Sequence, residues 1–501
     1  MHPDLQSPAH GQVSGRPAPE RPAGAPGGLI PAIALALLSC LPFLVAAYPP
    51  LTDYPSHLAR YHVMLDGGHS PFLARYYDFE WMFTGNLGAD LLVWPLSALF
   101  GLETAGWLIG LILPPLTGLG IVAVEWTLRR RIGVGSLLAF ALIWSPSMVM
   151  GFYNFCLALA LAFFAFALWA RLERWRWRWA LFLPIGLTVW LCHVAGWGVL
   201  GVLVFGYEWH RRKGIGAFVA TWPLALPLIP ALAAGEAGGG SPAVLYGANL
   251  MHYKIATWIR SMCDQSLPLD IVSLLIVIGV LLAALRARRF DGRLGWAALI
   301  LLVLAILMPR HLGGGDYADL RLIPVGLMVG FLAIDWRVPR WVLWLAPALF
   351  LVRLGVTTAA WHEQSRQIED MLGALDHMPM GARVAGAVLT RSSDWQSNPF
   401  AHVTSYATVR RDALVNSHFA VPGVHMLRVR EGGKDFVDPS QRVLLGRGEP
   451  VDLAEFAPAR EADFLWYVGK AEPRRMPPGA TVLFRTPGSF LARLAKPQSG
   501  G

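Results

Sequence analysis

The feature that most constrains this chain is a series of apolar segments that are long enough, or nearly so, to cross a lipid bilayer. A membrane-spanning helix needs about 20 apolar residues, and about eleven segments approach that length. They comprise residues 29–48, 106–128, 134–151, 153–170, 179–193, 195–209, 215–234, 269–285, 294–308, 322–334 and 341–360. Hydrophobic residues make up 55% of the 501 residues and charged residues only 15%, a balance that soluble domains do not need. The sequence therefore predicts a polytopic α-helical membrane protein.

The basic residues predict how these segments are oriented. Lys and Arg cluster in alternate connections when the N-terminus is placed inside and residues 179–209 are counted as two helices. The clusters are RRR (129–131), RLERWRWR (171–178), RRK (211–213), RARRFDGR (286–293) and DWRVPR (335–340). Because cytoplasmic loops carry an excess of Lys and Arg, this pattern predicts a multi-pass membrane protein with a cytoplasmic N-terminus. The net charge of +9 then reflects topology, and no nucleic-acid partner is indicated.

Three regions follow from this topology. Residues 1–28, rich in Pro, Gly, Ala and His, are expected to be a disordered cytoplasmic tail. Residues 29–360 form the transmembrane domain, and its first outer loop, 49–105, contains an apolar stretch at 87–100 that we expect to be a helix lying in the membrane interface. Residues 361–501 are expected to form a small periplasmic α/β domain, with helical spacing in HEQSRQIEDMLGALDHM and then strand-like runs. Those runs are ARVAGAVL, VHMLRV, ADFLWYV, ATVLF and SFLARL.

One carboxylate stands where the first segment leaves the bilayer. Asp53 opens the stretch DYPSHLARYHVML, immediately outside the apolar run that ends at Tyr48. A partly desolvated carboxylate at this height could take a proton from an incoming hydroxyl or amine. The alternative is structural, because Asp53 also precedes a short helix with Pro55 in its first turn and could cap it.

The order of these features resembles the GT-C class of membrane glycosyltransferases over nearly the full chain. The resemblance rests on an outer acidic residue after the first segment, a long loop ending in LFG (99–101), a helix ending in VEWTLRRRIGVG (124–135) and the following WSPSMVMGFYNF (144–155). This class includes protein O-mannosyltransferases, lipid A aminoarabinose transferases and oligosaccharyltransferase catalytic subunits. Asp53 matches the acidic residue that acts on the acceptor nucleophile in that class. The chain has DYPSH (53–57) in place of a paired Asp-Glu and lacks a WWDYG-like signature, so transfer to Asn in a sequon is not supported.

The resemblance implies a sugar donor carried on a polyprenyl phosphate and an envelope glycan, lipid or protein as acceptor. Breaking the sugar–phosphate bond leaves an anionic lipid phosphate that needs cationic or hydrogen-bonding partners. The candidates on the outer loops are Lys254, Arg260, Arg310, His311 and Arg321, of which the last three lie in MPRHLGGGDYADLRLIP (308–324). The alternative is that arginines at helix ends reach ordinary membrane lipid phosphates.

Other polar residues of the first outer loop are weaker candidates for substrate binding. His57 lies four residues after Asp53 and shares its helical face, while interfacial packing is an equal alternative. Asp78 and Glu80, in YYDFEW (76–81), could touch the sugar or a divalent cation, although metal sites need more oxygen ligands than one such pair supplies. The four cysteines show no CxxC spacing, so no metal or redox cofactor is indicated.

The main rival interpretation is a non-enzymatic transporter or flippase of lipid-linked glycans. Transporters usually carry charged residues near the bilayer midplane and often contain internal repeats. Here the polar residues gather at one face and no repeat is visible, which favours surface chemistry. A scaffold that keeps the fold without catalysis is a third alternative.

Overall fold

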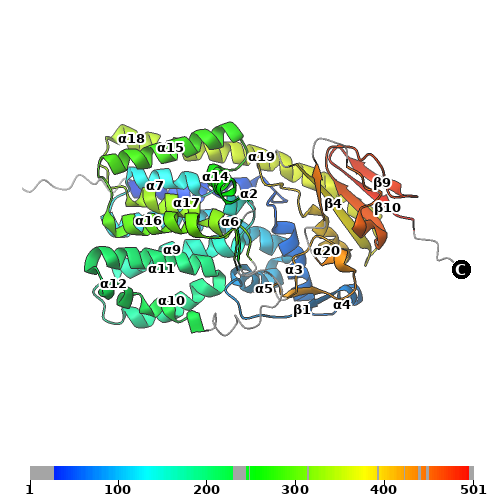
Figure 1. Ribbon diagram of the computed structural model, residues 1–501, viewed down its shortest axis with the longest axis horizontal. Helices are drawn as coiled ribbons and strands as arrows, with labels where there is room; N and C mark the ends of the chain where they lie inside the picture. The colour runs from blue at the N-terminus through cyan, green and yellow to red at the C-terminus, as the bar shows by residue number, and fades with distance from the viewer. Residues whose placement is uncertain are drawn as a thin grey trace, which may run out of the picture.

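The structure is a computed structural model in which a body of helices continues into a C-terminal β-sheet (Figure 1). It describes residues 28–229, 244–246, 249–312, 315–391, 394–422, 424–437, 442–446 and 451–495. The tail expected at 1–28 lies, apart from Gly28, outside the described residues. The structure therefore bears on the transmembrane and C-terminal regions.

The helical body contains most of the expected apolar segments as helices that run roughly along the long axis of the molecule (Figure 1). Among the residues that the structure describes, four helical stretches are both long and apolar enough to cross a bilayer: Leu102–Arg129, Tyr153–Arg171, Leu267–Arg286 and Arg340–His377. The helices are α1 (Leu29–Leu38), α2 (Leu41–Leu44), α6 (Leu102–Arg129), α7 (Val134–Ala139), α8 (Pro146–Val149), α9 (Tyr153–Arg171), α10 (Arg178–Cys192), α11 (Val194–Arg212), α12 (Ile215–Ala220), α14 (Leu250–Ile259), α15 (Leu267–Arg286), α16 (Gly292–Leu307), α17 (Ala318–Ala333), α18 (Arg340–Leu345) and α19 (Ala348–Leu372). This architecture is that of a multi-pass membrane protein.

Some expected spans are not continuous helices. The segment 29–48 is divided into α1 and α2 at Ser39, whose hydroxyl donates 2.5 Å to the carbonyl of Ala36, and Pro42 then occupies the first turn of α2. The segment 134–151 is divided where Pro146 begins α8, because proline cannot continue a preceding helix. The second interruption lies one turn before Met150, whose carbonyl accepts a hydrogen bond from the N–H of Asp53.

The region 179–209 forms two helices, as the distribution of basic residues predicts. The helix α10 ends at Cys192 and α11 begins at Val194, and the two helices fold back against each other (Figure 1). Between them His193 is extended, with φ −168° and ψ 130°, and its side chain accepts a hydrogen bond from the N–H of Ala195. This connection brings His193 towards the same end of the body as Asp53.

The first outer loop is folded. It contains α3 (Tyr54–Asp66), α4 (Pro71–Tyr76), β1 (Tyr77–Phe79) and α5 (Gly88–Phe100). The sequence prediction of a helix at 87–100 is confirmed by α5, which packs on α6 and α9. It leaves large apolar side chains exposed, at Leu91, Trp94, Leu99 and Phe100. An interfacial position for α5 stays a prediction.

The C-terminal region is a mixed sheet joined directly to the last long helix. Its strands run in the order β5-β4-β8-β10-β9, with β7 also paired to β4. They are β4 (Arg383–Arg391), β5 (Leu414–Val415), β7 (Val443–Gly446), β8 (Phe464–Val468), β9 (Thr481–Thr486) and β10 (Ser489–Arg493). The boundary expected at residue 360 falls inside α19, which runs unbroken to Leu372, so the helical body and the sheet share a rigid connection.

The C-terminal region also packs against the first outer loop. One expected strand, VHMLRV, forms β6 (Leu427–Val429), which pairs with β1 of the outer loop and stands apart from the main sheet. The helix α20 (Tyr406–Arg411) lies against α3 (Figure 1). These contacts close the C-terminal region over the turn that begins at Asp53.

Candidate active site

Asp53 is held by two loops that interlock. Its backbone N–H donates 3.0 Å to the carbonyl of Met150, in the connection between α8 and α9. The next residue, Gly151, has φ +86°, and a Cβ there would lie 3.3 Å from that of Leu51 and 3.4 Å from the nitrogen of Tyr54. Glycine is therefore required for the two loops to approach this closely.

The carboxyl group of Asp53 does not cap α3. Asp53 occupies the N-cap position, but its side chain makes no capping hydrogen bond, and among the described residues the carboxyl forms no hydrogen bond at all. The side chain is only 15% exposed. A carboxyl that is shielded from water and lacks donors is costly to ionise. The structure thus argues against the capping interpretation of this residue.

Burial raises the pKa of Asp53 to about 7, while Arg442 and Arg321 act in the opposite direction and Asp316 adds to the rise. Near neutral pH, both the carboxylate and the protonated acid are therefore populated. A group in this state can accept a proton during a reaction and release it afterwards.

Arg321 is the predicted cation that the structure brings to Asp53. It lies in the first turn of α17, where the preceding Tyr317 is left-handed with φ 56°. Its guanidinium stacks 4.2 Å from the ring centre of Phe152 and approaches His193 Nε2 to 3.1 Å. It acts electrostatically on Asp53 without a direct ion pair, and its buried Nε has no partner among the described residues. A positive charge with spare donors therefore lies near the carboxyl.

The other cations predicted from sequence are more fully engaged. Lys254 forms an ion pair of 2.6 Å with the buried Asp319 and also donates to two carbonyl groups. Arg310 makes a two-pronged ion pair with Asp316, at 2.9 and 2.8 Å. These ion pairs engage Lys254 and Arg310 close to the start of α17 and leave little donor capacity for a ligand.

Arg260 and His311, the two remaining candidates for binding the lipid phosphate, are placed differently. Arg260 donates to the carbonyls of Trp395 and Asp394, at 3.1 and 3.0 Å, so its positive charge meets only neutral acceptors there. It also acts electrostatically on Tyr317, which places it on the Arg321 side of the site. His311 lies in the short strand β3 (His311–Leu312), and its buried Nε2 has no partner among the described residues.

Asp78 and Glu80 are not brought to Asp53. Glu80 pairs with Arg428 at 2.7 Å and Asp78 with Arg430 at 3.4 Å, along the strands β1 and β6. These side chains are 39–55% exposed. The acid pair therefore joins the outer loop to the C-terminal region. Within the part of the chain that the structure describes, no group of three or more His, Cys, Asp or Glu residues could hold a metal ion.

His57 lies one helical turn beyond Asp53, as the sequence spacing predicts. Its N–H donates 3.1 Å to the carbonyl of Asp53, and its ring lies 5.7 Å from that of Phe419. Burial lowers the pKa of His57 to about 3, so the ring is neutral. Its Nδ1 has no partner among the described residues, which leaves an unused polar atom close to the site.

Two residues at the site were not predicted from sequence, and both come from the C-terminal region. His402 is fully buried and places Nε2 3.7 Å from Oδ1 of Asp53. Arg442 lies just before β7 and acts electrostatically on Asp53. Neither belongs to a recognisable motif, because each reaches the site only through the docking of the C-terminal region on the outer loop. No local sequence signal could have identified them.

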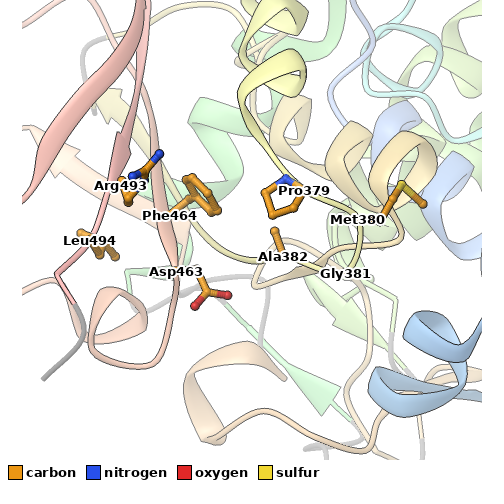
Figure 2. A pocket seen from close by; sticks show the side chains of 8 residues that line it. All are labelled: Pro379, Met380, Gly381, Ala382, Asp463, Phe464, Arg493 and Leu494. Atoms are coloured by element: carbon orange, nitrogen blue, oxygen red, sulfur yellow. The ribbon is translucent and has the colours of Figure 1, made fainter. Parts of the chain in front are cut away.

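A pocket lies elsewhere, between the segment Pro379–Ala382, which leads into β4, and residues at the ends of β8 and β10 (Figure 2). Its lining contains one acidic and one basic residue, Asp463 and Arg493, among largely apolar or backbone surfaces. Asp463 already accepts a hydrogen bond of 3.1 Å from the N–H of Arg383. Chemistry therefore points to Asp53 and not to this pocket.

No family model and no curated protein sequence matches the chain. Among solved structures, the chain is similar to the crystal structure of ArnT from Cupriavidus metallidurans bound to undecaprenyl phosphate. The match covers 95% of this chain and 100% of that chain, with 14% sequence identity and a TM-score of 0.48. At this level of similarity, the function of this chain has to be inferred from its own residues.

Proposed function

We propose that this protein is a GT-C-type glycosyltransferase of the bacterial inner membrane. It transfers a sugar from a polyprenyl-phosphate donor to an envelope acceptor at the periplasmic face, and Asp53 is the catalytic base. The observation that carries the proposal is a shielded carboxyl that does not cap a helix and, among the described residues, has only the neutral imidazole of His402 within 4 Å as a possible ion-pair partner, set among the charges of Arg321, Arg442 and Asp316. A structural carboxylate would have its oxygens satisfied.

The proposed reaction divides the work between the carboxylate and the cations. Asp53 takes the proton of the acceptor hydroxyl or amine as its oxygen or nitrogen bonds to the anomeric carbon of the sugar. The bond from that carbon to the phosphate oxygen breaks, and its electron pair leaves with the polyprenyl phosphate. Arg321 stabilises the negative charge that develops on the leaving phosphate, because a guanidinium presents several donors to phosphate oxygens.

The site lies at the level of the bundle where such a donor would present its sugar. Asp53 follows the first apolar helices, and Arg321 lies in the first turn of α17, so both lie at helix ends that face the C-terminal region. The helices α12 and α18, which follow two of the basic clusters, lie at the opposite end of the body (Figure 1). Positive-inside bias then assigns the site and the C-terminal region to the periplasm.

The transport alternative finds less support. Arg353, within α19, pairs with Asp270 of α15 at 2.7 Å, and both side chains are 2% exposed. Arg353 also donates to the carbonyl of Met262. A charge that is held inside the bundle by an ion pair stabilises a fixed arrangement of helices, and does not provide a relay for a moving substrate.

The proposal is tested by assaying the purified protein in proteoliposomes with polyprenyl-phosphate sugars. The choice of sugar and acceptor comes from comparing lipid-linked sugars and envelope glycans in a deletion strain and its parent. We expect Asp53→Asn to lower transfer by at least about 100-fold, because the amide keeps the size of the side chain but cannot act as a base. The matched control is Asp66→Asn, since Asp66 lies in the same outer loop and accepts only local N–H bonds. Equal activity of Asp53→Asn and wild type would reject the assignment.

A further inference from the structure

We propose that His402 of the C-terminal region is a positioning residue for Asp53: it accepts a hydrogen bond from the protonated carboxyl and so makes Asp53 a stronger base. The inference rests on the proposed function, because it assigns His402 a part in the same proton transfer. It gives the C-terminal region a role in the chemistry beyond docking on the outer loop.

The tautomer of His402 follows from its other nitrogen. Nδ1 lies 2.6 Å from the backbone carbonyl oxygen of Ser417, and a carbonyl can only accept, so Nδ1 must carry the proton. Burial keeps the pKa of His402 well below its ordinary value, so the ring is neutral and has a single N–H. Nε2 therefore presents a lone pair, and it points towards Asp53.

The ring is fixed in this orientation by its surroundings. His402 immediately precedes the short helical turn Val403–Ser405, and the hydroxyl groups of Ser405 and Ser417 lie 2.5 Å apart. The ring of Phe419 lies 5.1 Å from the imidazole. The bond to Ser417 and these packing contacts oppose rotation of the imidazole, so Nε2 stays aimed at the carboxyl.

The distance between the two groups has a simple physical reading. Nε2 of His402 is buried and has no hydrogen-bond partner among the described residues, and Oδ1 of Asp53 lies 3.7 Å away. That separation is too long for a hydrogen bond, as expected when an ionised carboxylate faces another acceptor. One proton on Asp53 would turn the contact into an O–H···N bond and satisfy both groups. The pocket is thus more complementary to protonated Asp53 than to the carboxylate.

Other charged and titratable groups near Asp53 and His402 favour or disfavour the charged form of each residue. Arg321 and Asp316 reach Asp53 from the helical body, and Arg442 reaches it from the C-terminal region. Arg442, His418 and His57 all disfavour a positive charge on His402. The two arginines favour the Asp53 carboxylate, and His402 opposes them. This balance keeps Asp53 able to take a proton without moving it on to the histidine.

The proton therefore follows a short and balanced route. It leaves the acceptor hydroxyl or amine for an oxygen of Asp53 as the new bond to the sugar forms. The protonated carboxyl of Asp53 then donates a hydrogen bond to Nε2 of His402. The imidazole stays neutral, and its Nδ1–H continues to donate to the carbonyl of Ser417. The proton returns to water after the product leaves, which restores the carboxylate.

The test uses variants that separate the two nitrogens of His402. His402→Asn keeps an N–H donor near the Nδ1 position for Ser417 and removes the acceptor that faces Asp53. His402→Gln carries an amide to the Nε2 position, where its N–H can donate to the carboxylate. The matched control is His62→Asn, because His62 joins the outer loop to the C-terminal region through Asp412, at 2.8 Å.

The readout is thermal unfolding of the full-length protein in detergent, with and without Asp53→Asn, from about pH 5 to about pH 9. The difference in Tm stops changing with pH above the folded pKa of Asp53, and so reports it without any substrate. We expect both His402 variants to lower that plateau point by about one pH unit and His62→Asn to leave it unchanged. The pH midpoint of the transfer rate should fall by the same amount, with the KM for the donor unchanged.

An unchanged plateau point in both His402 variants would overturn the proposal, and so would a lower transfer rate with an unchanged pH midpoint. Failure of both variants to fold would likewise assign His402 a purely structural role. If the wild-type protein shows no transfer with any donor, the proposed function fails, while the thermal data still decide whether His402 sets the proton affinity of Asp53.

Discussion

Glu208 and Asp53 are two shielded carboxylates at opposite ends of the helical body, and they differ in their hydrogen-bond and ion-pair partners. Glu208, near the end of α11, is fully buried and all its oxygens are satisfied. Its partners are Arg178 (2.9 Å), Arg212 (2.8 Å), Arg211 (3.2 Å) and the indole N–H of Trp169 (3.0 Å). The carboxyl of Asp53 forms no hydrogen bond with the described residues, and its Oδ1 lies 3.7 Å from Nε2 of His402.

This difference in hydrogen bonding separates a structural carboxylate from a functional one. A buried carboxylate that forms ion pairs with arginines, as Glu208 does with Arg178 of α10, ties neighbouring helices together. A carboxylate kept from water without donors is held at an energetic cost, which natural proteins accept mainly at functional sites. Glu208 is in this sense a structural residue, and Asp53 is the residue that the fold prepares for proton transfer.

The strongest test of the contrast is the effect of the same kind of substitution on stability. We expect Glu208→Gln to lower the free energy of unfolding by about 3–5 kcal/mol, because it leaves the buried charge of Arg178 without its counter-charge. Asp53→Asn should instead stabilise the protein at pH 8, on the order of 2–4 kcal/mol. Thermal unfolding in detergent measures both, and equal signs for the two variants would break the comparison.

The sign for Asp53 follows from its raised pKa. The folded state holds the proton more tightly than the unfolded chain, since the pKa of Asp53 rises from 3.8 to about 7. This tighter proton binding by the folded state stabilises the protein fully below about pH 4, and the stabilisation is lost as the pH rises to about 7. The advantage of Asp53→Asn over wild type should therefore shrink towards acidic pH and be constant above about pH 7.

The next largest effect concerns the cations. We expect Arg321→Gln to weaken binding of polyprenyl phosphate by about 10–100-fold, because a charge-assisted bond to phosphate contributes about 1.5–3 kcal/mol. Arg310→Gln should weaken it by less than about threefold, since Arg310 is already paired with Asp316. Binding of the lipid phosphate to protein in nanodiscs distinguishes the two. A larger loss of binding for Arg310→Gln than for Arg321→Gln would indicate that the lipid phosphate binds away from Asp53.

The pH dependence of transfer gives a somewhat smaller effect. The active form is the carboxylate, so the rate should rise about tenfold between pH 6 and pH 8 and level off above the pKa of Asp53. Initial rates with saturating donor and acceptor measure this profile. A rate that is flat over this range, or that falls with pH, is incompatible with Asp53 as a base whose pKa is about 7.

The smallest effect is expected at the acid pair of the outer loop. Asp78→Asn and Glu80→Gln remove exposed ion pairs with Arg430 and Arg428, and such pairs contribute less than about 1 kcal/mol each. Transfer rates should therefore stay within about twofold of wild type. A loss comparable to that of Asp53→Asn would show that the pair touches the substrate.

Much of the helical body is predictable from the sequence because apolar length and basic clusters are properties of local segments. The division at His193, the helix at 87–100 and most strands of the C-terminal sheet all follow from such local patterns. The breaks at Ser39 and Pro146 are harder to predict, because an apolar run does not show where a helix is interrupted. Helical spacing is predicted both in 341–360 and in the polar stretch that follows, and α19 joins the two into one helix that ends at Leu372, because composition changes there while helical geometry does not.

The site was predictable only in part, for a related reason. Asp53 stands out because a carboxylate shortly after an apolar segment is unusual. Arg321 stands out because it directly precedes the apolar segment 322–334. Whether Asp53 caps α3 depends on side-chain geometry, which spacing does not fix. His402 and Arg442 come from more than 300 residues away along the chain, through the pairing of β1 with β6 and the packing of α20 on α3.

The most direct test of the central claim is an electron cryomicroscopy structure of the protein in nanodiscs with a bound polyprenyl phosphate. The account predicts density for the phosphate within hydrogen-bond distance of the Arg321 guanidinium and in the same cavity as the Asp53 carboxyl. A phosphate bound at another face of the helical body, with Asp53 remote from it, would contradict the account.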